Sequence, residues 1–289
     1  MTAAGRCAII TLCSANRHDH LLNQRAAVEQ LALGHPLEHI VVWLDLQLPP
    51  ELPGATVLQV PPGALGLRLA AARNRGAACA LASGATVLIF LDADCIPGPE
   101  LVKRYLSAAE KHPGSLLGGP VTYLPEAFAL PDPRDDAAAI WAAATRPHPS
   151  RPAPPPGETT VATDHQYVLF WSLSFALGAD TWARLGGFHE DYEGYGGEDT
   201  DFGSAAQAAS IPLIWVGGAD AYHQHHPTAM PPWQHLDDIV RNAGLYFDRW
   251  GQWPMGGWLR EFATAGAIRL VGGRWQRSRG DISAGSLSR

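Results

Sequence analysis

The sequence predicts an α/β fold in which a mostly parallel β-sheet is flanked by helices. Short, β-branched apolar runs alternate with longer segments whose apolar residues recur at helical spacing. One of these runs, VLIFL at residues 87–91, is apolar at every position, as expected for a strand that is buried on both faces. Strands that alternate with helices in this way usually lie parallel in one sheet, so we expect such a sheet here.

The first 112 residues supply most of the expected elements. Gly34 follows a helical segment and is a common helix terminator, and a later helical segment has proline in its first turn. In chain order, we expect strands at 7–13, 39–46, 56–60 and 85–94, and helices at 20–33, 66–83 and 97–112.

The middle of the chain differs in composition from the rest. Residues 120–163 contain the proline-rich run RPHPSRPAPPPGE, and only AAAIWAAA at 137–144 has a helical pattern. We interpret this stretch as a long, partly mobile insertion. Beyond it, we expect strands at 167–178 and 212–217, and helices at 179–187, 204–210, 235–251 and 253–268.

These segments divide the chain into three parts. Residues 5–226 are expected to form one α/β domain that contains the insertion at 120–163. Residues 227–275 are expected to form a C-terminal helical extension, and residues 276–289, rich in Arg, Ser and Gly, a disordered tail. The chain has 289 residues, of which 46% are hydrophobic, so it can bury a substantial core.

The composition argues against several classes of protein. The formal net charge of −7 disfavours the broad basic surface that nucleic-acid binding requires. The four cysteines show no CxxC pairing and are interpreted as buried thiols of a reducing compartment. The apolar run at 7–13 is too short for a membrane helix, and no cleavage site follows it. We therefore expect no transmembrane segment and a cytoplasmic location, with peripheral attachment to the inner membrane face left open.

Two carboxylates follow the predicted strand at 85–94 in the stretch FLDADCIP. Parallel sheets bind ligands at the carboxyl ends of their strands, and Asp92 and Asp94 stand at one such end. Carboxylate oxygens suit Mg²⁺ or Mn²⁺, ions that usually share their coordination shell with substrate phosphates. The alternative is a turn with solvated aspartates, which is common after strands. The apolar run before the pair favours the ligand site.

A second group of acids lies in GYGGEDTDFG at 194–203. The glycines allow a sharp turn and close approach to a ligand, while Glu193, Glu198, Asp199 and Asp201 crowd together. Such crowding can raise the pKa of a carboxylate toward that of a working base. The alternative is an acidic helix N-terminus, which is a specific possibility for Asp201.

Two further motifs leave alternatives open. In AYHQHHP, His223, His225 or His226 could complete a metal shell, although the 12 histidines of the chain make coincidence a live alternative. A zinc site made of these histidines alone finds no support in a cysteine pair or an HExxH spacing. In ARNRG, Arg73 or Arg75 could hold a diphosphate or be a solvated helix arginine.

The order of these motifs resembles that of the GT-A glycosyltransferases of family 2. The resemblance rests on ARNRG, the D-x-D pair, LGGFHEDYEGYGGEDTDFG and YHQHHP, and it covers about residues 5 to 250. It is closest to the branch whose C-terminal half resembles the β-1,4-galactosyltransferases. The resemblance implies the GT-A fold, a Rossmann-like arrangement that binds nucleotide-diphosphate sugars.

The resemblance also implies a metal site. Asp92 and Asp94 would hold Mn²⁺ or Mg²⁺ on the diphosphate of the donor, with Asp94 as the direct ligand and Asp92 nearer the ribose. His223 would be the late histidine ligand of the family, and His225 is the second choice.

The remaining roles are implied in the same way. Asp199 would be the general base, Glu198 would bind the acceptor, and Arg73 and Gly197 would lie near the nucleotide sugar. Family members contact the base of the nucleotide after the first strand and at the end of the second, which here gives Thr11, Asn16, Arg17 and Asp45. Among the tryptophans, which can stack on sugar rings, Trp171 is our candidate for a wall of the acceptor site.

The resemblance therefore predicts an inverting, metal-dependent transfer of a hexose or N-acetylhexosamine. The donor would be a nucleotide-diphosphate sugar, with UDP favoured, and the acceptor a hydroxyl of a glycan, glycolipid or small molecule. One alternative is an inactive protein of the same fold that only binds nucleotide sugars or carbohydrates. Another is a sugar nucleotidyltransferase, but the loop SANRHDH lacks the glycines and lysine expected of a phosphate-binding loop. Tyr195, where the galactosyltransferases have tryptophan, and the proline-rich insertion depart from the family pattern.

Overall fold

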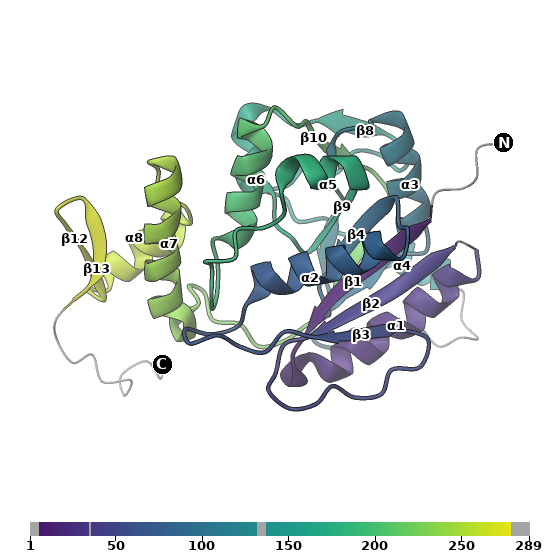
Figure 1. The fold of residues 1–289 in the computed structure, drawn as a ribbon, viewed down its shortest axis with the longest axis horizontal. Helices are drawn as coiled ribbons and strands as arrows, with labels where there is room; N and C mark the ends of the chain where they lie inside the picture. The colour runs from purple at the N-terminus through teal and green to yellow at the C-terminus, as the bar shows by residue number, and fades with distance from the viewer. Residues whose placement is uncertain (1–5, 35, 132–136, 279–289) are drawn as a thin grey trace.

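The computed structural model of the chain describes residues 6–34, 36–131 and 137–278 (Figure 1). Within these ranges, an eight-stranded sheet has the order β3-β2-β1-β4-β9-β6-β10-β8. Its strands are β1 (Cys7–Cys13), β2 (Leu37–Trp43), β3 (Thr56–Gln59), β4 (Val87–Leu91), β6 (Leu116–Gly118), β8 (Thr159–Val161), β9 (Ser174–Gly178) and β10 (Leu213–Val216).

The sheet is mostly parallel, which confirms the predicted fold class. Strand β1 pairs in parallel with β2 and β4, β2 with β3, and β10 with β6. Strand β9 runs antiparallel to both β4 and β6, and β8 runs antiparallel to β10 at the edge. The predicted strand at 167–178 is therefore only partly right, because residues 164–169 form a 3₁₀ turn and β9 begins at Ser174.

Alternate residues of the central strands pack on opposite faces of the sheet. Ile10 and Phe90 belong to the apolar cluster that packs under helices α2 (Leu69–Ala82), α5 (Ala179–Leu185) and α6 (Glu198–Ala208). Ile9 and Ile89 belong to the cluster under α1 (His18–Ala32) and α3 (Leu101–Lys111). Burial on both faces explains why these strands are apolar at every position.

A second, smaller sheet lies at the carboxyl end of β4. It consists of β5 (Cys95–Pro97), β11 (Ala221–His223) and β7 (Val121–Tyr123), in the order β5-β11-β7. In its register, His223 stands opposite Cys95 on one side and Tyr123 on the other. This small sheet therefore brings the D-x-D turn and the histidine cluster together, although 129 residues of sequence separate Asp94 from His223.

The proline-rich insertion has a defined path wherever the structure describes it. Helix α4 (Ala137–Ala144) places Trp141 against Tyr222 of β11, with ring centroids 4.3 Å apart. Further on, β8 extends the main sheet through its pairing with β10. The insertion thus contributes to both sheets, whereas residues 132–136 lie outside the described part of the chain.

The C-terminal region forms a unit at one end of the sheet (Figure 1). It contains α7 (Leu236–Trp250), α8 (Gly256–Thr264) and a hairpin of β12 (Ile268–Val271) and β13 (Arg274–Arg277), packed around its own apolar cluster. The predicted helical extension is therefore incomplete, because it ends in a hairpin. Of the predicted tail at 276–289, residues 276 and 277 belong to β13, and 279–289 lie outside the described residues.

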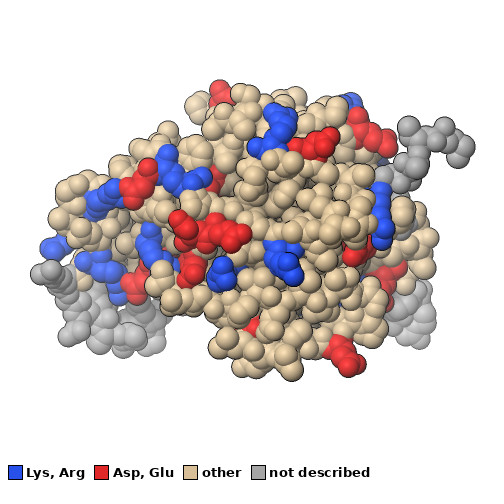
Figure 2. All heavy atoms as spheres, viewed as in Figure 1, with Lys and Arg blue, Asp and Glu red and all other residues tan. Residues whose placement is uncertain are grey.

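The surface agrees with the composition. On the face drawn in Figure 2, Lys and Arg side chains are interspersed with acidic ones and form no broad basic patch. Across the described ranges, each helix is too short or too polar to cross a lipid bilayer.

Gly76 lets α2 pack closely on the sheet. A Cβ atom at this position would lie 2.5 Å from Cγ2 of Ile10 and 3.2 Å from Cγ2 of Val42. We expect Gly76→Ala to lower the free energy of unfolding by about 1–3 kcal/mol through overpacking, despite its better helix propensity. Urea denaturation followed by circular dichroism measures this change.

Gly244 provides the matched control. It lies inside α7, and a Cβ there meets no atom of the described residues within 4 Å. Gly244→Ala should therefore raise the free energy of unfolding by about 0.5–1 kcal/mol. Equal stabilisation by both substitutions would contradict the close approach of α2 to β1.

Candidate active site

The D-x-D turn at the end of β4 is fixed by a buried glutamine from α1. Gln24 donates from Nε2 to the carbonyl oxygens of Asp92 at 2.7 Å and Cys95 at 2.9 Å. The Thr11 hydroxyl donates to Oε1 of Gln24 at 2.8 Å, and its oxygen lies 3.2 Å from Nε2 of His39. Thr11 and Gln24 are both completely buried, so this chain of hydrogen bonds holds the backbone of the turn.

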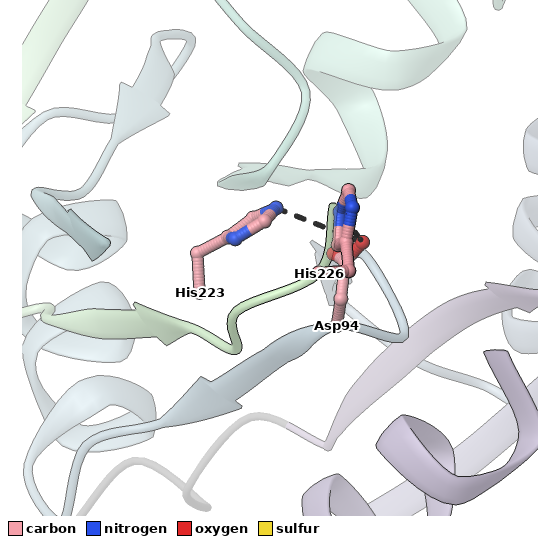
Figure 3. A group of neighbouring side chains, drawn as sticks. All are labelled: Asp94, His223 and His226. Carbon is pink, nitrogen blue, oxygen red and sulfur yellow. Dashed lines mark ion pairs between the residues drawn. The ribbon is translucent and has the colours of Figure 1, made fainter. Parts of the chain in front are cut away.

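Three side chains converge on the carboxylate of Asp94. Its Oδ2 lies 3.6 Å from Nε2 of His223, 3.4 Å from Nε2 of His226 and 3.4 Å from Nε of Arg17. The ligand atoms of Asp94, His223 and His226 all lie within 4.8 Å of one another, and both imidazoles turn toward the carboxylate (Figure 3). One carboxylate and two imidazoles are a donor set that suits Mn²⁺ and other first-row metals.

The protonation states also suit a metal site. Burial alone would raise the pKa of Asp94, but the hydrogen bond from His226 and the charges of His223, His226 and Arg17 lower it to about 2. Burial lowers the pKa of His223, although Asp94 opposes this. Asp94 is therefore ionised and His223 is neutral near pH 7, the forms that coordinate metals.

The predicted metal ligands need two corrections. His225, our second choice, is exposed and does not belong to the group, whereas His226 does. The reason is the path of the chain after β11. The backbone N–H of Gln224 donates to the carbonyl oxygen of Asp94, and this hydrogen bond holds the segment after β11 against the D-x-D turn. Asp92 is also outside the group of described residues that could hold a metal, because its carboxylate faces Arg73 instead.

Arg73 connects the two acidic motifs. Its guanidinium donates to Oε1 of Glu198 at 3.0 Å and lies 3.4 Å from Oδ1 of Asp92. The side chain is only 3% exposed, and it also lies over the ring of Phe188 at 5.1 Å. Arg75, the other arginine of the motif, is exposed. The structure thus selects Arg73 as the arginine that faces the site.

Burial dominates the titration of Asp92. It raises the pKa of this carboxyl, with Asp94 and Glu198 adding to the effect and Arg73 opposing it, to about 7. The negative charge on Asp92 is therefore costly without a further cation. A bound divalent cation or a phosphate-bound metal is the kind of partner that relieves this cost.

Helix α6 begins at Glu198, six residues earlier than predicted. The segment that we interpreted as one acidic loop therefore ends at Gly197. Gly197 has a φ of +96°, and a Cβ atom added to it would lie 3.0 Å from the ring of Tyr192. Both facts require glycine at this position. Gly197 thus shapes the entry to the helix. Asp201 lies in the first turn of α6, as the alternative for this residue predicts, and its carboxylate accepts hydrogen bonds from Arg249, Trp250 and Tyr192.

Asp199 differs from its neighbour Glu198. Glu198 is buried and held by Arg73, whereas Asp199 is partly exposed and accepts hydrogen bonds from the backbone N–H and hydroxyl of Thr200. Burial and the charge of Glu198 raise the pKa of Asp199 to about 6, although Arg73 opposes this. A carboxylate with a pKa near 6 can accept a proton at neutral pH.

The loop before α6 is braced from the C-terminal unit. Asn242 of α7 donates to the carbonyl oxygens of Glu193 at 3.0 Å, Tyr195 at 3.2 Å and Gly196 at 2.8 Å. Arg241 also donates to the carbonyl oxygen of Glu193. This brace could not be read from the sequence, because nothing in the motif indicates which distant helix satisfies its carbonyl groups.

The residues expected to contact the nucleotide base divide into two groups. Asn16 is exposed and Arg17 is partly exposed beside Asp94, so both remain available to a ligand. Asp45 is partly exposed and accepts a hydrogen bond from the backbone N–H of Ala15, which ties the ends of the first two strands together. The prediction that Thr11 contacts the nucleotide base is wrong, because its completely buried hydroxyl is bonded to Gln24 and cannot reach a base.

Trp171 lies next to two residues of the proline-rich insertion. It is partly exposed, its ring contacts His148 with centroids 5.1 Å apart, and the guanidinium carbon of Arg151 lies 5.4 Å from its centre. His148 and Arg151 belong to the proline-rich insertion, and the sequence did not indicate either as a site residue.

Part of the chain is similar in sequence to known glycosyltransferases. Residues 64–160 match the family model described as glycosyl transferase family 2. Validoxylamine A glucosyltransferase of Streptomyces hygroscopicus subsp. jinggangensis is 34% identical over 161 residues, which is 52% of this chain and 37% of the relative. The same enzyme of S. hygroscopicus subsp. limoneus is also 34% identical over 161 residues. The chain thus spans less than two fifths of the length of these relatives.

Solved structures show the same fold. TarS 1–349 of S. aureus is 12% identical and superposes with a TM-score of 0.54, over 83% of this chain and 64% of that one. GalNAc-T7, solved with UDP, GalNAc and Mn²⁺, is 12% identical and gives a TM-score of 0.50 over 86% of this chain and 50% of that one. The catalytic domain of Drosophila β1,4-galactosyltransferase 7 gives only 0.47, so the expected kinship with that branch stays a prediction.

We call Asp94, His223 and His226 the metal group, and His226 offers a direct test of it. We expect His226→Gln to weaken Mn²⁺ binding at least about tenfold, because it removes one imidazole from a three-residue group. His225→Gln, which changes the exposed neighbour, should leave the affinity unchanged. Isothermal titration of the metal-free protein with Mn²⁺ measures both variants, and the reverse result would move the site to His225.

Proposed function

We propose that the chain is a family 2 glycosyltransferase that transfers a hexose or N-acetylhexosamine from a nucleotide-diphosphate sugar to an acceptor hydroxyl with inversion. The observation that carries the proposal is the position of Arg73 between Asp92 and Glu198. This one side chain links the carboxylate turn next to the metal group with the acidic helix start that carries Asp199. A donor-binding group and a base would thereby be held beside each other, as a direct displacement requires.

The donor side would be built around Asp94, His223 and His226. These residues would hold Mn²⁺ or Mg²⁺, and Asp92, paired with Arg73, would lie beside them nearer the ribose. When bound, the cation would neutralise negative charge that develops on the leaving diphosphate. Arg17, which already lies against Asp94, can donate to a phosphate oxygen from the same side. Of the nucleotides, UDP is favoured by the family resemblance.

The acceptor side would use Asp199. As the acceptor oxygen forms its bond to the anomeric carbon, the bond between that carbon and the diphosphate oxygen breaks, and Asp199 takes the proton of the attacking hydroxyl. Glu198 cannot take this role easily, because it is buried and bound to Arg73. We assign it to fixing Arg73 and binding the acceptor. A single displacement needs no covalent intermediate, and it inverts the configuration.

The named relatives indicate where to begin with substrates. Because they are glucosyltransferases of validoxylamine A, UDP-glucose is the first donor to test, and validoxylamine A is the first acceptor. UDP-galactose and UDP-N-acetylglucosamine extend the donor series, and simple pyranosides and cyclitols extend the acceptor series.

The role of Asp199 separates transfer from donor binding. We expect Asp199→Asn to lower kcat for transfer about 10²–10⁴-fold, because the amide cannot accept the proton. Donor binding should persist, since the group around Asp94 is untouched. Product formation by mass spectrometry and stabilisation by UDP with Mn²⁺ in a thermal melt measure the two functions. Transfer by the Asn variant at the parent rate would exclude Asp199 as the base, and a parent protein that neither binds UDP nor transfers would exclude the proposal.

The pH dependence follows from the raised pKa of Asp199. With a pKa of about 6, this carboxyl is mostly protonated below that pH and mostly ionised above it. We expect kcat at saturating Mn²⁺ and donor to rise with pH through about 6 and to level off toward pH 8, because only the ionised form accepts a proton. The residual rate of Asp199→Asn should lack this rise. Measured pH–rate profiles of the two proteins test this, and a flat parent profile is the contrary result.

A further inference from the structure

A row of aromatic rings leads away from the metal group along the proline-rich insertion. Tyr123 lies against His223 with ring centroids 4.6 Å apart, His148 follows Tyr123 at 5.8 Å, and Trp171 follows His148 at 5.1 Å. We call Tyr123, His148 and Trp171 the aromatic row. The aromatic row begins beside His223, a residue of the metal group, and is longer than one sugar ring.

The small sheet fixes the order of the rings. Tyr123 of β7 stands opposite His223 of β11 in the parallel register. The returning chain of the insertion then pairs with the outer side of β7, because Pro147 bridges to Thr122 and the His148 N–H donates to the carbonyl oxygen of Val121 at 3.0 Å. The insertion is thereby bound to the sheet that carries the metal group, and His148 lies beside Tyr123.

The side chains of this row are partly exposed to solvent. Tyr123 is 49% exposed, and His148, Trp171 and His223 are each partly exposed. Burial and the charge of Arg151 lower the pKa of His148, so its imidazole is neutral at pH 7. The row itself contains no acid or base that is charged at that pH. Neutral aromatic surfaces of this kind suit the C–H face of a sugar ring rather than an anion.

A buried cation lies beneath the row. Arg151 is 5% exposed, and its guanidinium carbon lies 5.4 Å from the ring centre of Trp171 and 5.1 Å from that of Trp215. None of its three guanidinium nitrogens has a hydrogen-bond partner among the described residues. Burying such a charge is costly, and the two indoles supply the compensation that the structure shows. Arg151 thus connects Trp171 with the wholly buried Trp215.

We propose that the aromatic row is the acceptor subsite, that it takes a neutral six-membered polyol ring, a pyranose or a cyclitol, and that Arg151 is its positioning residue. The inference rests on the proposed glycosyl transfer. The donor sugar is tied to a diphosphate held near Asp94 and His223, so a surface that runs outward from His223 is available to a second ring. The insertion that departs from the family pattern would thus select the acceptor.

The test uses ring binding by the protein loaded with Mg²⁺ and UDP. Methyl α-D-glucopyranoside and myo-inositol are the probes, sorbitol is the open-chain control, and saturation-transfer NMR measures their dissociation constants. We expect Trp171→Ala and Tyr123→Ala each to weaken ring binding about tenfold, since one aromatic face is worth on the order of a factor of ten. Phe128→Ala, which removes a ring of the same insertion that stacks on Trp141, should bind the probes as the parent does.

The outcomes separate this subsite from the proposed function. Thermal stabilisation by UDP with Mg²⁺ reports the donor site, and it should be the same in the parent and all three variants. If that stabilisation persists while Trp171→Ala and Tyr123→Ala bind the rings as tightly as the parent, or while the parent binds neither ring, the subsite is refuted and the transferase is not. If UDP does not stabilise the parent, the proposed function fails first.

Arg151 requires its own pair of variants. Arg151→Met fills a similar volume without a charge, whereas Arg151→Lys keeps a cation between the two indoles. We expect the Met variant to weaken ring binding about threefold to tenfold and to change the near-ultraviolet circular dichroism of the tryptophans, and the Lys variant to restore most of both. Parent-like binding and spectra in the Met variant refute the positioning role. If the Met variant does not fold, the Lys variant decides. A folded Lys variant that has the near-ultraviolet spectrum of the parent but binds the rings more weakly also refutes the positioning role.

Discussion

The ion pairs of Arg73 are the interaction on which the rest of the site depends. A buried arginine is costly unless its charge is matched, and here Glu198 and Asp92 match it from two different parts of the chain. Burial opposes the charge on Arg73, but the two carboxylates keep its pKa raised. The consequence is spatial, because one side chain sets the separation between the carboxylate turn after β4 and the first turn of α6.

Around this link, two neighbouring acids have different properties. Glu198 is neutralised by Arg73 and fixed in place, whereas Asp199 keeps a partly exposed carboxylate whose pKa is raised to about 6. The geometry of one helix start therefore gives two neighbouring acids different surroundings, which is the basis of the different roles that we propose for them. The small sheet completes the site from the other direction, since its register places His223 beside the turn that carries Asp94.

Much of the fold could be predicted because local patterns determined it. The apolar runs and helix terminators located the central strands and helices, and Asp92 and Asp94 lie at the carboxyl end of β4, as the apolar run before them indicated. What failed depended on contacts between distant segments. His226 lies in the metal group and His225 does not, because a backbone hydrogen bond from Gln224 folds that loop. Thr11 is not available to a nucleotide base, because its hydroxyl is hydrogen-bonded to Gln24. Neither contact leaves a pattern in the sequence, and the same holds for β7 and the returning chain at Pro147.

The brace from Asn242 to the carbonyl groups before α6 limits how the C-terminal unit of this protein can change. A C-terminal unit with its own apolar cluster looks like an appendage that evolution or an engineer could exchange freely. Yet its first helix supplies hydrogen bonds to three carbonyl groups, those of Glu193, Tyr195 and Gly196, in the loop that leads into the acidic helix start. A grafted or shortened C-terminus would leave those carbonyl groups without partners. The unit and the loop must therefore change together if the entry to α6 is to keep its shape.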